Sequence, residues 1–171
     1  MGLVAIRQAA MLEVYLQRHG IAEESGPGGQ DADRALTAEG KRKLQSVFRA
    51  ARKADVRPAL ILTSPYKRAV QTAELAAQVL SCPGGALQTD ALKPGASPRE
   101  AWAEIRLHKK AGRILLAGHE PLFSQLAAYL LDSPGLCVDF KKGAILRIDF
   151  ASAGAAPRGV LKWMITPSTA G

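Results

Sequence analysis

Short apolar segments alternate with helix-forming segments along most of this chain. Apolar, strand-forming runs occur at residues 12–17, 58–63 and 113–117, and turn-forming residues follow each of them. Amphipathic, helix-forming stretches lie between and after these runs. Strands that alternate with helices pair mostly in parallel, with the helices covering both faces of the sheet. The sequence therefore predicts an α/β fold, a three-layer sandwich around a mostly parallel central sheet.

Capping signals predict where the helices begin. Thr37 is placed to cap the first helix, and Ser64-Pro65 supplies a capping residue and a proline at the expected start of the second. Ser97 and Glu100 have the spacing of a capping box. The remaining predicted elements are a third helix from Ser97 to about Lys110, a fourth after Pro121, a weak strand before the third helix, and closing strands at 144–150 and 160–165.

The length of 171 residues fits one compact domain, which we assign to residues 11–171. We interpret residues 1–10 as an N-terminal extension, too short for a secretory signal. No apolar run reaches the ~20 residues of a membrane span. The two cysteines, Cys82 and Cys137, lie far apart, which argues against a disulfide scaffold. We therefore expect a soluble, cytoplasmic protein that does not bind a membrane.

The formal net charge of +8 favours anionic ligands. Nucleic acid is one such ligand, but only 5% of the residues are aromatic, so rings on which bases could stack are scarce. We expect no nucleic-acid partner, although a phosphate-reading or nucleic-acid-binding module remains the non-enzymatic alternative.

Three polar clusters follow strands directly: Arg18-His19-Gly20, Ser64 to Arg68, and Gly118 to Pro121. In open α/β sheets the ligand crevice lies beyond the carboxyl ends of the strands, so segments remote in sequence meet there. The sequence therefore predicts two arginines and two histidines around one point. Such a pocket suits a tetrahedral anion.

This residue set also indicates a chemistry. The positive field of arginines lowers the pKa of a neighbouring imidazole and keeps it neutral, hence nucleophilic. A neutral histidine can attack phosphorus and form a phosphohistidine intermediate, which water then hydrolyses. The second histidine and the arginines would stabilise charge on the phosphoryl oxygens.

The motifs in the three polar clusters together resemble those of a known family. The motifs R-H-G at Arg18, S-P-x-x-R-A-x-Q-T-A from Ser64 and G-H-x-P from Gly118 are similar to the signature of the histidine phosphatase superfamily, which includes phosphoglycerate mutases. The chain length, the R-x-L-T-x-x-G motif from Arg34 and a tryptophan-bearing last strand further resemble small SixA-type phosphohistidine phosphatases. The resemblance spans roughly residues 11–167.

The resemblance implies a role for each matching residue. His19 would be the nucleophile, Arg18 and Arg68 would bind the phosphoryl oxygens, His119 would complete the pocket, and Arg34 would line its entrance and contact substrate. Larger family members also use an acidic proton donor after the second helix, where this chain has Thr89-Asp90-Ala91-Leu92-Lys93-Pro94 and no glutamate. This departure leaves the general acid unassigned and favours a substrate with a good leaving group.

Other polar residues receive structural interpretations. We interpret Asp31 and Asp33 as part of a solvated turn rather than a metal or aspartyl-phosphate motif, because no apolar strand precedes them. Glu23 and Glu24 could act as an acid, but we favour a role in adjusting the charge of the pocket. His108, beside two lysines, is expected on the surface.

The leading functional hypothesis is a metal-independent phosphatase that uses no cofactor and removes the phosphoryl group from phosphohistidine in a partner protein. The alternative enzyme is a phosphatase for a small metabolite such as a sugar phosphate or nucleotide. A mutase is less favoured, because the chain has little spare length for a lid over the substrate. We expect a monomer, and no zinc-ligand spacing is present in the sequence.

Overall fold

The structure, a computed structural model, describes residues 11–171. These residues form one six-stranded sheet with four α-helices, and four short 3₁₀ turns lie in the loops. The strands are β1 (Leu12–Arg18), β2 (Leu60–Thr63), β3 (Ala86–Gln88), β4 (Arg113–Gly118), β5 (Ile145–Phe150) and β6 (Val160–Ile165), and the helices are α1 (Ala38–Lys53), α2 (Lys67–Leu80), α3 (Pro98–Leu107) and α4 (Leu122–Leu130).

The sheet has the strand order β3-β2-β4-β1-β5-β6. The pairs β3–β2, β2–β4 and β4–β1 are parallel, whereas β1–β5 and β5–β6 are antiparallel. The expected mostly parallel sheet is confirmed, with two antiparallel strands added at one side. The order places the carboxyl ends of β2, β4 and β1 next to one another, which is where the polar clusters begin.

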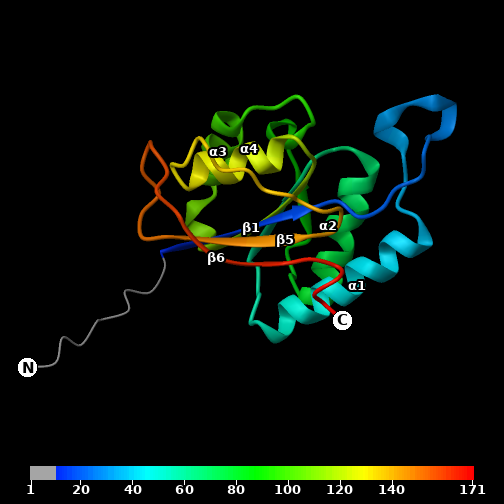
Figure 1. The fold of residues 1–171 in the computed structure, drawn as a ribbon, viewed down its shortest axis with the longest axis horizontal. Coiled ribbons are helices and arrows are strands. Elements are labelled where there is room, and N and C mark those ends of the chain that lie inside the picture. The colour runs from blue at the N-terminus through cyan, green and yellow to red at the C-terminus, as the bar shows by residue number, and fades with distance from the viewer. Residues whose placement is uncertain (1–10) are drawn as a thin grey trace, which may run out of the picture.

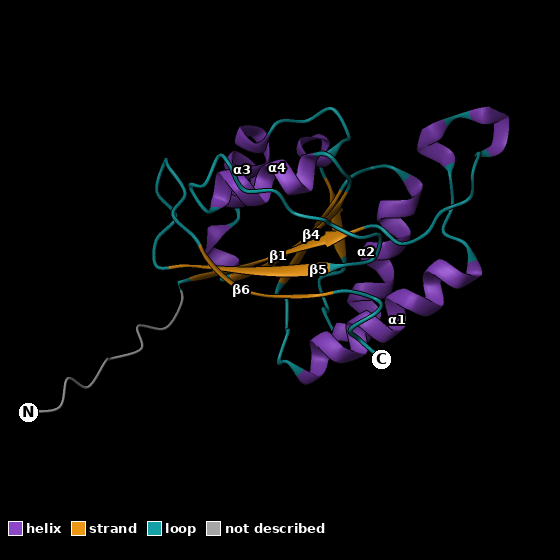
Figure 2. Cartoon of the chain, in the orientation of Figure 1, coloured by secondary structure: helices purple, strands orange, loops and turns teal. Residues whose placement is uncertain are grey.

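Helices cover both faces of the sheet, as Figures 1 and 2 show. Side chains alternate across a strand, so β1 sends Tyr15 into the core beneath α1 and α2, and Val14 and Leu16 into the core beneath α3 and α4. Phe48 anchors the first core and Trp102 the second, and both are almost fully buried. The predicted three-layer sandwich is therefore confirmed.

Two of the three capping predictions hold. The Thr37 hydroxyl accepts a hydrogen bond from the Gly40 N–H at 2.9 Å, and Ser97 with Glu100 forms the predicted capping box. The third is wrong: α2 begins at Lys67 rather than directly after Ser64, and its N-terminal residue has no side-chain cap. Ser64 instead lies in a turn that frees its hydroxyl for the polar site described below.

The third helix is shorter than predicted. It ends at Leu107, and a separate 3₁₀ turn over residues 109–111 leads to Gly112, whose φ of +72° closes the turn before β4. The predicted extension, residues 1–10, lies outside the described residues. Within residues 11–171, no helix combines the length and apolarity needed to cross a bilayer.

Candidate active site

The three polar clusters meet at the carboxyl edge of the sheet. Arg18 at the end of β1 pairs in register with Gly118 at the end of β4, and the His19 N–H donates to the Gly118 carbonyl at 2.9 Å. The Ser64 N–H, just beyond β2, donates to the carbonyl of Ala117 at 3.0 Å. Main-chain hydrogen bonds thus hold the starts of all three clusters together.

Two glycines allow this close approach. A Cβ on Gly20 would lie 2.7 Å from a methyl carbon of Leu44 in α1, and a Cβ on Gly118 would lie 2.7 Å from the Phe123 ring in α4. Real Cβ atoms do not approach other atoms so closely, so any larger residue would push the chain away from its helix. The glycine of the R-H-G motif therefore has a packing role directly beside His19.

His19 is held in a defined tautomer. Its Nδ1 lies 2.7 Å from the carbonyl oxygen of Gly20, and a carbonyl only accepts, so Nδ1 carries the proton. Nε2 is left with its lone pair, toward which Nε of Arg68 donates at 3.3 Å. His19 as a whole is 6% exposed. One nitrogen is therefore anchored, and the other is unprotonated and beside a guanidinium group.

Both histidines of the site are neutral at physiological pH. Burial lowers the pKa of His19 to about 4, with smaller contributions from the Arg68, Arg18 and Lys142 cations, against an opposing effect of the Gly20 hydrogen bond. Burial likewise lowers the pKa of His119 to about 3. The sequence interpretation named the arginine field as the cause of neutrality; burial is the larger cause, and the arginines reinforce it.

His119 lies across from His19, with 5.1 Å between the ring centroids. Its Nε2 is 2.8 Å from the Ser64 hydroxyl oxygen. Because that oxygen already accepts a hydrogen bond from the Tyr66 N–H, its own proton can be donated to Nε2, which places the ring proton on Nδ1. The other ring nitrogen, Nδ1, is buried without a hydrogen-bond partner. The Tyr66 ring packs edge-on against His119 at 5.3 Å. His119 is thus fixed through one nitrogen while the other is available to a ligand.

Arg68 is oriented by an aspartate from the loop before α1. Its guanidinium donates to the Asp31 main-chain carbonyl at 2.7 Å and to the Asp31 carboxylate at 3.0 Å. The pKa of Asp31 is lowered by hydrogen bonds from Arg34 and Arg68, so this carboxylate stays charged. The Asp31 side chain is 55% exposed, as expected for a residue in a solvated turn. The sequence interpretation did not anticipate that the same carboxylate binds two arginines.

Arg34 lies on the far side of the same carboxylate. Its guanidinium donates to the other oxygen of Asp31 at 2.8 Å and to the Glu23 carbonyl at 2.6 Å. Arg34 therefore braces the loop that holds Arg68. Its predicted contact with substrate at the entrance stays a prediction.

Arg18 approaches the site from the other side. Its Nη1 donates to the carbonyl of Phe140 at 2.6 Å, and burial lowers its pKa. Its Nε is buried without a partner. Among the described residues, three buried side-chain atoms lack a partner: Arg18 Nε, His119 Nδ1 and Gln17 Oε1. Because buried polar groups are normally satisfied, finding two of the three on residues of this cluster indicates a place for an anionic ligand.

Sequence reasoning missed two supporting residues. The Thr72 hydroxyl accepts from the Gly20 N–H at 3.3 Å and donates to the Arg68 carbonyl at 2.7 Å, which joins two of the polar clusters. Gln17 is fully buried and donates to the carbonyls of Arg18 and Gly143. Thr72 belongs to the S-P-x-x-R-A-x-Q-T-A motif and could have been identified there, whereas nothing in the sequence marks Gln17.

The carboxylates near the site are either engaged or exposed. Both oxygens of Glu120 accept hydrogen bonds at 2.7 Å from Ser124. Glu23 and Glu24 are exposed, and Asp90, in the segment without a glutamate, pairs with Lys93 at 2.9 Å. The structure therefore assigns no carboxyl group as a proton donor, and the preferred role of Glu23 and Glu24 in adjusting charge stays a prediction.

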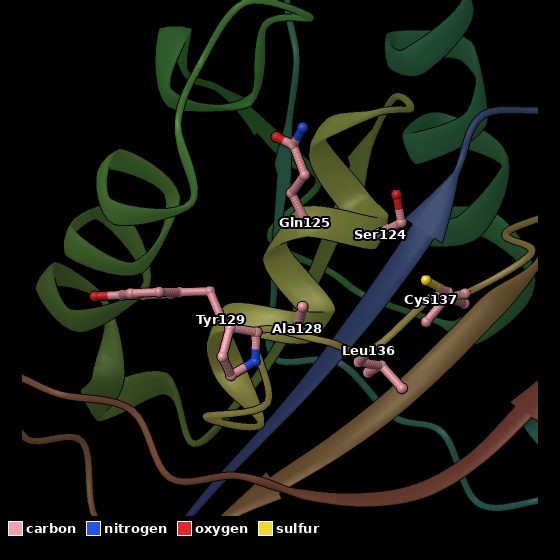
Figure 3. Close-up of a pocket in the computed structure, with 8 residues that line it drawn as sticks. Ser124, Gln125, Ala128, Tyr129, Leu136 and Cys137 are labelled. Carbon is pink, nitrogen blue, oxygen red and sulfur yellow. The ribbon is translucent and has the colours of Figure 1, made fainter.

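A separate hollow of about 490 Å³ lies on the outer side of α4. Figure 3 shows Ser124 and Cys137 on one side of this helix and the Tyr129 ring pointing away from them. Cys137 is a free, exposed thiol. None of the four clustered residues Arg18, His19, Arg68 and His119 lines this hollow, so it is distinct from the candidate site. Within residues 11–171, no group of three or more His, Cys, Asp or Glu side chains could hold a metal ion.

Comparison with known proteins gives a consistent result. The profile of the histidine phosphatase superfamily (branch 1) matches residues 14–91. An uncharacterised protein of Picosynechococcus is 31% identical over 144 residues, which cover 83% of this chain and 87% of that protein.

Two solved structures have similar folds. The structure of the protein histidine phosphatase SixA complexed with tungstate matches with a TM-score of 0.80 at 25% identity, over 92% of this chain and 98% of that one. A mycobacterial glucosyl-3-phosphoglycerate phosphatase matches with a TM-score of 0.64 at 14% identity, over 88% and 97% of the two chains, a likeness of fold alone.

Proposed function

Since the chain belongs to the histidine phosphatase superfamily, we propose that it is a phosphatase in which Nε2 of His19 accepts the phosphoryl group. One observation carries this proposal. The proton of His19 is held on Nδ1 by the Gly20 carbonyl, so Nε2 keeps an unprotonated lone pair, which accepts a hydrogen bond from Nε of Arg68 at 3.3 Å. A nucleophile and a donor for phosphoryl oxygens thus lie within one ligand's reach.

The proposed reaction has two steps. First, the Nε2 lone pair forms a bond to phosphorus, the bond from phosphorus to the leaving group breaks, and the leaving group departs with that electron pair. Arg18, Arg68 and Nδ1 of His119 are the donors for the phosphoryl oxygens. Second, a water oxygen attacks phosphorus, the P–Nε2 bond breaks, and inorganic phosphate leaves while the water's proton passes to solvent.

The state of the carboxylates favours a particular leaving group. Asp31 is held in its charged form by two arginines, and Glu120 accepts two hydrogen bonds from Ser124, so neither is suited to protonate a leaving alkoxide. A phosphoramidate nitrogen needs less such help than an alkoxide oxygen. We therefore propose phosphohistidine in a partner protein as the substrate, in line with the likeness to SixA.

The likeness to SixA also supports the ligand class. The solved SixA structure is a complex with tungstate, which is a tetrahedral oxyanion like phosphate. The unpartnered donors Arg18 Nε and His119 Nδ1 would suit the oxygens of such an anion. Metal-independence is part of the proposal and is tested below.

The test compares wild type with His19→Ala on para-nitrophenyl phosphate in the presence of EDTA. We expect wild type to turn over and His19→Ala to lose at least about 10³-fold in kcat/KM, because the step through His19 is removed. His108→Ala is the matched control, since this histidine lies away from the site beside Glu104 and should retain full activity. Equal rates in wild type and His19→Ala would contradict the proposal, and activity restored only by a divalent ion would contradict metal-independence.

Substrate class is tested separately. A phosphohistidine-bearing protein should be dephosphorylated with a higher kcat/KM than any member of a panel of sugar phosphates and nucleotides. When the phosphoryl group of the substrate is labelled and the reaction is quenched without acid, the label should appear on His19 of wild type. His19→Ala should carry no label. A preference for one of the metabolites would instead support the small-molecule alternative.

A further inference from the structure

A basic hollow opens beside Arg18, with a volume of about 760 Å³. It lies where the end of β1, the loop before β5 and the chain after β6 come together, and Figure 1 shows the C-terminal end of the chain beside α1. Its polar lining consists of four cations, one carboxylate and two hydroxyls: Arg18, Lys43, Lys141, Lys142, Asp139, Thr166 and Ser168. The lining is therefore strongly cationic.

The loop that carries the two adjacent lysines is tied to the catalytic edge. The Gly143 N–H donates to the His19 carbonyl at 2.9 Å, and Nε2 of Gln17 donates to the Gly143 carbonyl at 3.0 Å. Arg18 donates to the carbonyl of Phe140 at 2.6 Å on the other side of the lysines. Lys141 and Lys142 thus have a fixed place relative to His19.

The cations of the hollow differ in how far they are neutralised. Lys43 pairs with Glu39 at 2.7 Å, and Lys141 pairs with Asp139 at 2.7 Å. Lys142 is exposed and makes no ion pair within residues 11–171. Its charge is close enough to His19 to contribute to the lowering of that pKa. The hollow therefore presents an uncompensated cation directly beside the phosphoryl site.

We propose that the basic hollow binds acidic side chains that flank the phosphorylated residue on a protein substrate, with Lys142 as the main contact. This inference rests on the proposed function, and it specifies that the surface of the partner protein is acidic around the phosphohistidine. The three lysines are exposed side chains around an open hollow, an arrangement that suits the varied carboxylates of a protein surface. The buried donor of the lining, Arg18 Nε, belongs to the phosphoryl site itself.

The test uses two synthetic peptides with one central phosphohistidine, flanked on each side by three glutamates or by three glutamines. Wild type should dephosphorylate the glutamate-flanked peptide with a kcat/KM about tenfold higher than the glutamine-flanked one, because each exposed ion pair contributes up to about fivefold. In Lys142→Glu this ratio should fall to about one or below. The ratio within each variant cancels any effect of Lys142 on His19, which both peptides share.

Lys109→Glu is the matched control. It makes the same change of net charge at an exposed lysine in the 3₁₀ turn before β4, toward the opposite edge of the sheet. Its ratio should stay at about ten, and the ratio of wild type should approach one in 1 M salt. Lys142→Gln, which is less disruptive, should give an intermediate ratio and guards against misfolding of Lys142→Glu.

Each remaining outcome counts against a stated idea. Equal kcat/KM for both peptides in wild type, or a preference that persists in both Lys142 variants, overturns the role of the hollow while the proposed function stands. If wild type dephosphorylates neither peptide faster than His19→Ala does, phosphohistidine is not the substrate. The proposed role of the hollow is then contradicted as well.

Discussion

Charged groups gather at both ends of β1, but the two clusters are arranged in opposite ways. At the amino end of β1, Arg147 pairs with Glu13 at 3.2 Å and with Asp149 at 2.7 Å, and the Tyr15 hydroxyl donates to Glu13. At the carboxyl end of the same strand, the guanidinium Nε of Arg18 has no partner, and two histidines lie neutral beside it.

We interpret this difference as one between a structural cluster and the proposed active site. At the amino end of β1, Arg147 is paired with both Glu13 and Asp149, so the charges of this cluster are balanced within the protein. At the carboxyl edge cations and a buried imidazole nitrogen outnumber the carboxylates that face them, and Asp31 is the acid that binds Arg68. Unbalanced positive charge in a half-enclosed place is what an anionic substrate would complete.

The largest expected effect of a substitution in this comparison is at Arg68. Arg68→Ala should lower kcat/KM for para-nitrophenyl phosphate by about 10²–10³-fold, because a preorganised donor to the phosphoryl oxygens is lost. The free energy of unfolding of this variant should fall by about 1–2 kcal/mol, because a buried guanidinium that donates to His19 and to the Asp31 carbonyl is lost, whereas the Asp31 carboxylate is itself half exposed. Steady-state kinetics and urea unfolding measure the two quantities. A variant that keeps wild-type kcat/KM would remove Arg68 from the site.

The second expected effect is a loss of folding stability at acidic pH, caused by His19 at the carboxyl end of β1. The pKa of His19 is about 4 in the folded protein, below its ordinary 6.5, so between these pH values the unfolded chain binds a proton that the folded protein does not. This contribution to stability is complete above pH 6.5 and is lost as the pH falls toward 4, by about 3 kcal/mol.

Urea unfolding at pH 7, 5.5 and 4.5 checks this dependence. His19→Gln should show a shallower loss of stability than wild type, because the substituted side chain does not titrate. His119 remains in the variant and accounts for part of the slope that is left. Identical slopes in the two proteins would mean that His19 titrates normally in the folded state.

The smallest effect is expected at the amino end of β1, where a substitution should lower stability and leave activity unchanged. Arg147→Ala leaves Glu13 and Asp149, which are 19% and 14% exposed, without their shared partner. We expect a loss of about 2 kcal/mol in the free energy of unfolding, because partly buried carboxylates lose their ion pairs. At a temperature where the variant is folded, its kcat/KM should equal that of wild type. A large loss of activity without a loss of stability would contradict the division between the two edges.

Much of this architecture could be predicted from local patterns. The alternation of apolar runs with amphipathic segments predicted the layers, because short apolar runs bounded by turn residues are typical of buried strands, whereas a 3.6-residue apolar period is typical of a helix with one apolar face. The placement of His19, Ser64 and His119 just after strands predicted that they meet. That inference needed only the rule that parallel strands end at a common edge.

What could not be predicted depends on contacts between distant loops. Asp31 binds Arg68 across 37 positions, and nothing in the sequence around Asp31 distinguishes it from a solvated loop acid. The start of α2 was misplaced for a related reason: Ser64 has the local character of a cap, but its hydroxyl bonds to His119, 55 residues away. Local propensity cannot anticipate a tertiary partner that competes for the same group.

The loop that carries Asp31 projects from the body of the molecule, as Figure 1 shows for the segment before α1. Asp31 sets the orientation of Arg68, although it belongs neither to the sheet nor to either core. Exchanges in such a protruding segment are tolerated by a stable scaffold. The loop is therefore a natural point at which evolution, or an engineer, can adjust turnover while His19, the proposed nucleophile, and its supporting strands remain untouched.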